Sequence, residues 1–382
     1  MSEPTSGPKG GAAPGEPGGP SLPPIPGGVT LDPGDRVLVT GAAGFIGSAV
    51  TRALLGRGAA VVAGIEPGGS VANLAGLDVD QVTVDIRDPV AVDRAVAGCR
   101  AVFHVAALYG FWPRDAKVFY EVNVEGTRNV LAAAGRHGCE RVVYTSSVAT
   151  LGIEQTRSGK PSHEGSPAVV DHLFGAYKQS KYVAEHEALR AAAEGLPLTL
   201  VLPTYPLGPR DSRPTPTGKL VLDFLNGRMP AFVDTAMNVA HVDDLAEGHV
   251  LALERGAQGR SYIVGGENLS MAELLALLAD RTGLPAPRRR VPGALALGAA
   301  YVSDTVQGRL LGKEPSVPLE GARMAATHMI YDDSRARTEL GYTSRPPGRA
   351  VEDSARWFVD HGYVSAARLP RITLAPPAPA SP

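Results

Sequence analysis

Short runs of apolar residues alternate along this chain with segments that have the length and periodicity of helices. The runs are rich in Val, Ile and Leu, which is typical of strands that are buried on both faces. We place the strands at residues 36–40, 60–65, 81–84, 101–105, 141–145 and 198–202. Because a helix-length segment separates each strand from the next, the pattern predicts an α/β fold built on a doubly wound parallel sheet.

The segment after the first strand shows the helical pattern most clearly. Its apolar residues recur at i, i+3, i+4, i+7 and i+8, and they are Ile46, Ala49, Val50, Ala53 and Leu54. This spacing predicts an apolar stripe on one face of a helix that packs on the sheet. Gly58 follows the stripe, and we expect the helix to end there.

The pattern divides the chain into four parts. Residues 1–34 repeat Pro, Gly and Ser without periodicity, so we expect them to be disordered. Residues 35–204 form the sheet domain, and residues 205–365 form a smaller C-terminal substrate-binding lobe that is interleaved with the last strands of the sheet. Within this lobe, residues 270–273 (SMAE) predict a helix that opens with a capping box. Residues 366–382 are expected to be a disordered tail.

The longest apolar stretch, residues 291–302, contains Pro292 and is too short to span a bilayer. We interpret it as core or as a pocket wall. Attachment to a surface is an alternative that the sequence by itself does not support.

Charge and cysteine content narrow the function classes. The 37 basic and 39 acidic residues give a net charge of −2 and are mixed along the chain. The chain as a whole therefore lacks the basic field that a nucleic acid or an acidic membrane attracts, and we expect no nucleic-acid partner. Cys99 and Cys139 stand apart from any metal-type pair, so we expect reduced, buried thiols, no bound metal and a cytoplasmic location. We also expect no secretory leader.

The first predicted strand runs directly into residues 41–47 (GAAGFIG). This places a G-x-x-G-x-x-G pattern between a strand and a helix, where Gly41, Gly44 and Gly47 permit a tight turn and close approach of a pyrophosphate. The amino terminus of the helix attracts the negative charge of that pyrophosphate. The chain is therefore predicted to form a Rossmann domain that binds a dinucleotide.

Glu66 lies at the end of the second strand, nineteen residues after Gly47. An acidic side chain there accepts hydrogen bonds from the adenosine ribose and repels a 2′-phosphate, which favours NAD over NADP. The alternative is a solvated loop residue before Pro67, with Ile65 at the ribose position.

Three residues form the candidate catalytic group. Tyr177 and Lys181 are four residues apart and so share one face of a helix. The Lys181 ammonium favours the phenolate of Tyr177, because a nearby positive charge lowers a phenol's pKa. Ser147 ends the fifth strand, where its hydroxyl can hold the substrate oxygen, and Ser146 is the second choice.

With these motifs, the sequence resembles the extended short-chain dehydrogenases/reductases of the NAD-dependent epimerase/dehydratase family over residues 35–363. Within that family it is most similar to the hopanoid-associated sugar epimerase subgroup of the dihydroflavonol-reductase-like branch. The segments that carry this resemblance are residues 123–127 (NVEGT), 143–152 (VYTSSVATLG), 223–230 (DFLNGRMP) and 241–244 (HVDD).

The resemblance adds cofactor contacts to the glycine loop and Glu66. It implies that they come from Ala43, Phe45, Ile46, Asp85, Ile86, Ala106, Ala107, Asn123, Thr145, Ser146, Tyr177, Lys181, Pro203 and Thr204. It also implies that Asn123 supports the site through backbone and water contacts. A homodimer is expected, paired through the helices that carry Asn123 and Tyr177.

The chemistry of this family includes ketone reduction, epimerisation and dehydration. Val148 and Ala149 stand where the family's dehydratases carry an acid pair, which disfavours dehydration. Tyr205 stands where nucleotide-sugar epimerases usually carry asparagine, although Glu66 departs from the arginine of the NADP-preferring reductases. We interpret the chain as an NAD-dependent oxidoreductase/epimerase acting on a secondary alcohol or ketone, by resemblance a sugar epimerase of hopanoid synthesis. The alternatives are a dihydroflavonol-4-reductase-like ketone or aldehyde reductase and a non-catalytic dinucleotide sensor.

Candidate substrate contacts have a weaker sequence signal than the cofactor and catalytic motifs. Tyr109, Phe111 and Trp112 could line an apolar pocket, although such clusters more often belong to a core. Polar contacts could come from Arg210, Asp211 and Lys219, for which surface roles are equally plausible. We assign no chemistry to His241, Asp243 and Asp244, because an aspartate before residues 245–247 is a natural helix cap.

Overall fold

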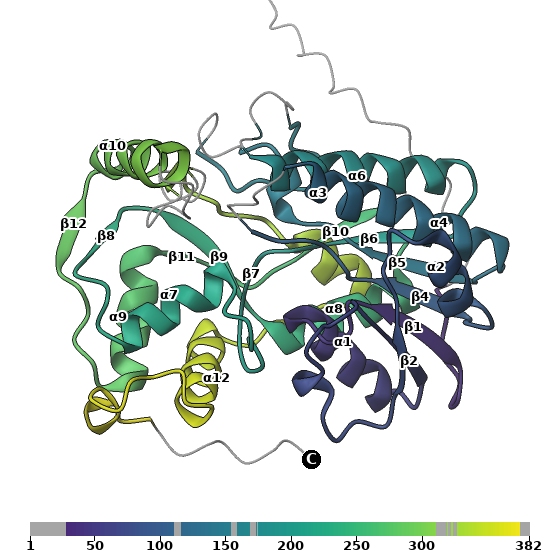
Figure 1. Ribbon diagram of the computed structural model, residues 1–382, viewed down its shortest axis with the longest axis horizontal. Helices are drawn as coiled ribbons and strands as arrows, with labels where there is room; N and C mark the ends of the chain where they lie inside the picture. The colour runs from purple at the N-terminus through teal and green to yellow at the C-terminus, as the bar shows by residue number, and fades with distance from the viewer. Residues whose placement is uncertain are drawn as a thin grey trace, which may run out of the picture.

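The computed structural model describes residues 28–110, 116–153, 159–168, 173, 175–310, 319, 322–323 and 327–374. Within these residues, seven strands form one parallel sheet in the order β10-β6-β5-β4-β1-β2-β3 (Figure 1). The strands are β1 (Arg36–Thr40), β2 (Ala60–Ile65), β3 (Asp80–Thr83), β4 (Ala101–His104), β5 (Arg141–Thr145), β6 (Leu198–Pro203) and β10 (Ser261–Val264). The predicted doubly wound parallel sheet is confirmed.

The six predicted strands agree with the structure to within one residue at each end. The pattern could not identify the seventh strand, β10, which lies far along the chain and pairs with β6 through Ser261 and Leu200. The chain after residue 204 therefore contributes one strand to the sheet.

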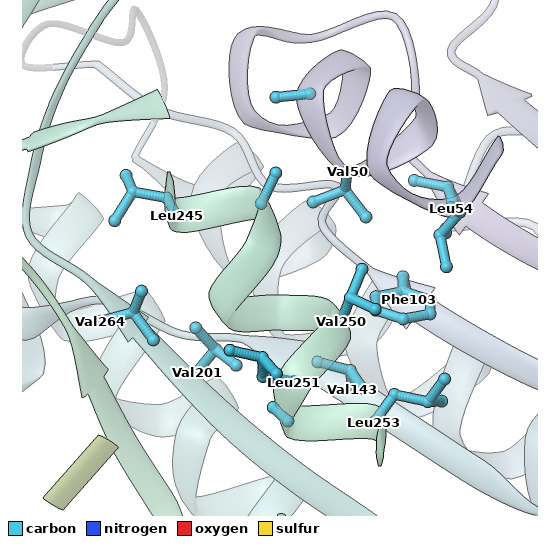
Figure 2. Close-up of a cluster of buried hydrophobic side chains, with 14 of the residues drawn as sticks. Val50, Leu54, Phe103, Val143, Val201, Leu245, Val250, Leu251, Leu253 and Val264 are labelled. Carbon is cyan, nitrogen blue, oxygen red and sulfur yellow. The ribbon is translucent and has the colours of Figure 1, made fainter. Parts of the chain in front are cut away.

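Helices cover both faces of the sheet. One face carries α1 (Phe45–Gly56) and α8 (Val242–Arg255), which contact each other and share a core with the sheet. Figure 2 shows Val50 and Leu54 of α1 next to Val250 of α8 and Phe103 of β4, all of them fully buried. The other face carries α2 (Pro89–Val96), α4 (Gly126–Arg136) and α6 (Ala176–Ala193) over a second core.

The smaller lobe has its own core and its own short sheets. Strands β9, β7 and β11 form one sheet, and β8 pairs with β12 in another. These elements are β7 (Tyr205–Leu207), β8 (Ala231–Val233), β9 (Ala236–His241), β11 (Glu267–Ser270), β12 (Arg289–Val291), α7 (Pro216–Leu225), α9 (Met271–Thr282), α10 (Gly293–Ser303) and α12 (Pro347–Asp360). The predicted capping box is present, because the Ser270 hydroxyl and the Glu273 side chain each bond the other residue's backbone N–H.

Short helical turns complete the described chain. They are η1 (Ala72–Leu74), α3 (Lys117–Tyr120), η2 (Glu121–Glu125), η3 (Val148–Thr150), η5 (Asp304–Leu310), η6 (Ala336–Leu340) and η7 (Leu369–Arg371). None of the helices within the described ranges combines the length and the apolarity that crossing a bilayer requires. Cys99 and Cys139 are buried with free thiols, as expected.

Both ends of the ordered chain extend beyond the expected limits. Val29 N–H donates to Leu253 O at 3.1 Å, before the boundary at residue 34, and Thr373 N–H donates to Thr282 O at 2.9 Å, after the boundary at residue 366. The remainder of the two segments expected to be disordered, residues 1–27 and 375–382, lies outside the described residues.

The interpretation of residues 291–302 as core or pocket wall is wrong. These residues form most of α10, in which only Ala300 is buried, while Leu295, Tyr301 and Val302 are among the most exposed large apolar side chains of the described chain. The run of apolar residues resembles a core helix in sequence, but the neighbouring elements of the described chain leave one face uncovered.

Candidate active site

The glycine loop follows β1 as predicted and leads into the amino terminus of α1. Gly41 has a φ of +67°, a left-handed conformation that side chains disfavour. A Cβ on Gly47 would lie 2.0 Å from the carbonyl oxygen of Gly41, so the loop and the helix meet at a distance that only glycine allows. No side chain caps the start of α1, and no acidic residue lies in its first turn. The loop therefore presents open backbone N–H groups, which suit a pyrophosphate.

One cavity of about 900 Å³ brings together almost all of the predicted site residues. It begins at the glycine loop, passes the carboxyl ends of the central strands and extends into the smaller lobe. The predicted residues in its wall are Gly41, Ala43, Gly44, Phe45, Ile46, Gly47, Glu66, Asp85, Ile86, Ala106, Ala107, Thr145, Ser146, Ser147, Tyr177, Lys181, Pro203 and Thr204. A crevice at the carboxyl ends of parallel strands is where this fold binds ligands.

The loops after β2 and β3 supply the acidic residues of the cavity. Glu66 forms an ion pair with Arg213, with 2.9 Å between Oε1 and Nη1, and both side chains are 67% exposed. Asp85 pairs with Arg87 at 2.7 Å, and hydrogen bonds from Arg87 hold the pKa of the Asp85 carboxyl below its usual value. Because its ion pair is exposed, Glu66 can exchange Arg213 for a ribose hydroxyl at little cost.

Tyr177 and Lys181 occupy the first turns of α6 and both line the cavity. The ring of Tyr177 makes edge contacts with Tyr109 and with Phe119, at centroid distances of 4.7 and 6.1 Å. Gly175 precedes the helix with a φ of +91°, which allows the chain to turn sharply into it. The helix thus places the phenol of Tyr177 and the ammonium of Lys181 on one wall.

The ammonium of Lys181 is fully buried. It donates hydrogen bonds to the carbonyl oxygen of Thr145 at 2.8 Å and to the hydroxyl of Tyr144 at 3.3 Å. Burial lowers the pKa of Lys181 to about 8, while the negative charge of Glu185 acts in the opposite direction. A cation held this way supplies a fixed positive charge beside Tyr177.

Ser147 follows β5 and lies at the start of η3. Its oxygen accepts a hydrogen bond from Ala149 N–H at 3.1 Å, which orients the hydroxyl and leaves its proton for a further acceptor. Ser146, the second choice, donates instead to the buried carboxylate of Glu185. The hydrogen bonds therefore distinguish the two serines in favour of Ser147.

Glu185 was not among the predicted residues. Its carboxylate accepts hydrogen bonds from Ser146 and, at 2.8 Å, from the Thr150 hydroxyl, one helical turn after Lys181. Burial raises the pKa of Glu185 above its usual value. A glutamate in an amphipathic helix looks like a surface residue in sequence, and the only available signal was its i+4 spacing from Lys181.

A buried chain of hydrogen bonds was also not predicted from the sequence. The Thr40 hydroxyl bonds His104 Nδ1 at 2.8 Å, and His104 Nε2 bonds the Thr127 hydroxyl at 3.0 Å. Thr127 in turn donates to the carbonyl oxygen of Asn123, while Ala106 N–H donates to Thr40. Burial lowers the pKa of His104 to about 3, so the imidazole is neutral and fixes the ends of two neighbouring strands.

Asn123 does not line the cavity, although it was expected among the cofactor contacts. Its side-chain amide bonds both the N–H and the carbonyl oxygen of Leu108, and it donates to the Ser180 hydroxyl at 2.9 Å. Asn123 lies in the π-helical segment η2, a distortion that often marks functional sites. Its observed contacts support the loop and the helix on either side of the cavity.

Thr204 follows β6, and its buried hydroxyl oxygen has no hydrogen-bond partner within the residues that the structure describes. A buried polar atom without a partner costs free energy unless a ligand satisfies it. The glycine loop can hold a phosphate, and the Thr204 hydroxyl lacks a partner among the described residues. The cavity therefore fits a polar, phosphate-bearing group such as a dinucleotide.

The smaller lobe forms the opposite end of the cavity from both apolar and polar side chains. The apolar ones include Tyr205, Leu220, Met237, Met271, Met329 and Tyr331, and the polar ones include Thr217, Thr235, Asn238 and Thr327. Asp211 also lines this end, where burial raises its pKa to about 6 while Thr215 donates to it. Arg210 pairs with Asp243 and Lys219 with Asp223, and neither cation reaches the cavity wall. Tyr109 lines the cavity, whereas Phe111 and Trp112 lie outside the described residues.

The cap of α8 differs from the expected one. The His241 side chain, and not an aspartate, accepts from the backbone N–H of Asp243 at 3.0 Å. Asp244 accepts from Arg345 N–H. The contacts of His241 and Asp244 are therefore structural.

Comparisons with known proteins agree with this geometry. The family described as "NAD dependent epimerase/dehydratase family" matches residues 37–265. A putative dihydroflavonol 4-reductase from Synechocystis sp. is 44% identical over 86% of this chain and 96% of its own length. Sterol demethylase protein B from Methylococcus capsulatus is 34% identical over 86% of this chain and 99% of its own length.

A solved structure leads to the same assignment. The crystal structure of a nucleoside-diphosphate-sugar epimerase from Pseudomonas aeruginosa is 27% identical, with a TM-score of 0.72 over 87% of this chain and 99% of that chain. The match of the family model, the identity to full-length relatives and the shared fold lead to one conclusion. The chain belongs to the NAD-dependent epimerase/dehydratase family and is an NAD-dependent enzyme of the extended short-chain dehydrogenase type.

Proposed function

We propose that this enzyme interconverts a secondary alcohol and a ketone on a substrate with a large apolar body. The observation that carries the proposal is the convergence of Ser147, Tyr177 and Lys181 on the wall of one cavity, between the glycine loop and an apolar lobe. The glycine loop would hold the cofactor, which when bound would supply hydride as NADH or accept it as NAD⁺. The residues of the chain then have to hold the substrate oxygen and move one proton.

Each residue has a separate part in that task. Ser147 donates its hydroxyl proton in a hydrogen bond to the substrate oxygen, since its own oxygen is already held by Ala149 N–H. Tyr177 exchanges a proton with the same substrate oxygen. Lys181 stabilises the phenolate form of Tyr177 through its buried positive charge. The unpaired hydroxyl of Thr204 and the glycine loop hold the cofactor.

The far end of the cavity supports an apolar substrate. Met237, Met271 and Met329 offer adaptable apolar surface, with Leu220 and Tyr331 beside them. Polar side chains, among them Thr217, Thr235 and Asn238, also line this end and can hold polar groups of the substrate. The names of the two relatives, a dihydroflavonol reductase and a sterol demethylase protein, also suggest ring-containing apolar substrates.

Sugar epimerisation, expected from the resemblance to the hopanoid-associated subgroup, is the second candidate. The same three residues can serve it, because inversion needs an oxidation followed by a reduction at one carbon. The similarity to a nucleoside-diphosphate-sugar epimerase over 87% of the chain favours this candidate. Unlike net reduction, inversion leaves the cofactor unchanged overall.

Cofactor turnover separates the two candidates. The purified protein is mixed either with NADH and a polycyclic ketone, such as a 3-ketosteroid, or with NAD⁺ and a panel of nucleoside-diphosphate sugars. NADH is followed at its absorption band, and the products are analysed by mass spectrometry and NMR. We expect stoichiometric loss of NADH with the ketone. Inversion of a sugar without net formation of NADH from NAD⁺ would instead support the epimerase, and no change with either substrate would contradict both.

We further propose a homodimer that pairs through α4 and α6. The outer faces of these helices border a hollow of about 580 Å³ whose wall includes the exposed Ala132 and the half-buried Ala191. Exposed apolar surface of this kind is suited to a helical interface. Light scattering on the eluted protein tests the assignment, and a monomeric mass would contradict it. The cytoplasmic location also stays a prediction.

A further inference from the structure

Helix α10 exposes an apolar face that no element of the described chain covers. The exposed fraction of the side chain is 66% for Leu295, 61% for Tyr301 and 60% for Val302, and Val306 in the following turn is 44% exposed. These residues are four of the nine large apolar residues that are exposed in the described chain. Figure 1 shows α10 at the outer edge of the smaller lobe, beside β8 and β12.

The outward residues follow one side of the helix. Leu295, Ala299 and Val302 are spaced at i, i+4 and i+7, and all three are exposed. A surface helix normally presents charged or polar residues to water on the face opposite its apolar stripe. In contrast, residues 291–303 contain no charged side chain, so both the inward and the outward faces of α10 are apolar. Such a face is characteristic of a site that contacts another apolar phase.

A run of three arginines ends shortly before this helix begins at Gly293. Arg288, Arg289 and Arg290 are all exposed, and the last two belong to β12. Arg290 lies 3.8 Å from Asp234 and over the ring of Phe232. Arg288 and Arg289 have no ion-pair partner among the described residues, so their charge is open to an external anion. The whole-chain balance of −2 conceals this local concentration of positive charge.

We propose that α10 and the arginine run 288–290 dock the enzyme on an anionic lipid surface. Leu295, Tyr301 and Val302 enter the boundary between headgroups and acyl chains, with the helix axis in the plane of the membrane. Arg288 and Arg289 contact the lipid phosphates beside it, which adds an electrostatic attraction to the apolar one. The inference goes beyond the proposed function, because lipid binding requires neither cofactor nor turnover.

A second copy of the chain suits this face less well than a membrane does. An isologous contact places the same patch of both subunits in one interface, and so it would bring two arginine runs together. Like charges that lose their water in an interface repel each other strongly. An anionic lipid surface instead complements both the apolar stripe and the arginines.

Vesicle sedimentation with the full-length chain tests the proposal. The probes are large unilamellar vesicles of pure phosphatidylcholine and vesicles that also contain 30% phosphatidylglycerol, a composition chosen to give roughly the anionic content of a charged leaflet. We expect binding to the anionic vesicles that falls at least tenfold when the salt concentration rises from about 0.05 to 0.5 M. Equal binding to the neutral and the anionic vesicles, or no binding to either, would overturn the proposal.

Two double variants separate the apolar and electrostatic contributions. L295Q/V302Q and R288Q/R289Q should each weaken binding to the anionic vesicles at least tenfold, whereas V90Q, at an exposed apolar position of α2, should leave it unchanged. All three variants should bind the cofactor with the affinity of the parent protein, and this unchanged affinity would show that they are folded. A loss of self-association in L295Q/V302Q without any loss of lipid binding would show that a second copy covers the face. Equal lipid binding by parent and variants would likewise contradict the assignment.

Discussion

The ammonium of Lys181 donates a hydrogen bond of 2.8 Å to the main-chain carbonyl oxygen of Thr145, at the carboxyl end of β5. This contact ties the helix that carries Tyr177 to the strand that leads into Ser147. The same bond keeps a positive charge in a buried position, where it acts strongly on its neighbours. The relative placement of the three proposed catalytic groups therefore rests on this pair.

The buried ammonium predicts an alkaline limit to ketone reduction. Lys181 has a pKa of about 8, so it carries its charge below that pH and loses it as the pH rises further. Since the charge supports Tyr177, we expect kcat to fall as the pH rises through about 8. The measurement is the rate of NADH oxidation at saturating substrate from pH 6 to 10. A rate that stays constant across this range would contradict the role of Lys181.

Glu185 is expected to act as a positioning residue through Lys181. Its negative charge raises the pKa of Lys181, and E185Q keeps the hydrogen-bonding shape while removing the charge. The alkaline limit of E185Q should move about one pH unit lower, by the usual effect of a nearby opposite charge. E187Q is the control on the same helix, because Glu187 pairs with Arg128 of α4 and not with Lys181. An unmoved limit in E185Q would assign Glu185 a purely structural role.

The close packing of the glycine loop predicts that alanine substitutions at Gly47 and Gly56, both in α1, have very different effects. A Cβ at Gly47 would lie 2.0 Å from Gly41 O, whereas a Cβ at Gly56 would meet nothing within 4 Å. We expect G47A to lower the free energy of unfolding by about 1–3 kcal/mol and to abolish measurable NADH binding. G56A should change stability by no more than about 0.5 kcal/mol. Thermal unfolding and NADH fluorescence titration check both variants, and normal NADH binding by G47A would show that the pyrophosphate lies elsewhere.

Glu66 is expected to set the preference for NADH over NADPH. In E66Q the negative charge that opposes a 2′-phosphate is lost, so kcat/KM with NADPH should rise about tenfold relative to NADH. R213Q removes the ion-pair partner of Glu66 and leaves its charge, so it should not favour NADPH. The ratio of kcat/KM for the two cofactors is the readout. A ratio that is the same in E66Q and the parent would place the ribose contact on another residue.

The sequence predicts most of the sheet domain because the apolar runs are short, buried and separated by periodic helices. The glycine loop and the spacing from Tyr177 to Lys181 are equally local features. The chain from Thr40 through His104 to Thr127 is not local, since it joins residues that only the parallel pairing of β1 and β4 brings together.

Residues whose roles depend on burial are the ones that the sequence cannot predict. Glu185 looks like an ordinary surface glutamate until the fold places Ser146 and Thr150 against its carboxylate. Helix α10 looks like core until its neighbours leave Leu295 exposed. In both cases the identity of the side chain is compatible with two environments, and only tertiary packing decides between them.

In the proposed mechanism, Tyr177 carries the proton in a reaction at a carbon–oxygen bond. Y177F removes the phenolic hydroxyl and leaves the glycine loop and Thr204 in place. With the parent enzyme's substrate and NADH, kcat of Y177F should fall by about 10²- to 10⁴-fold, the usual contribution of a general acid or base, while the Kd for NADH from fluorescence titration changes little. Turnover by Y177F at the parent rate would contradict the mechanism.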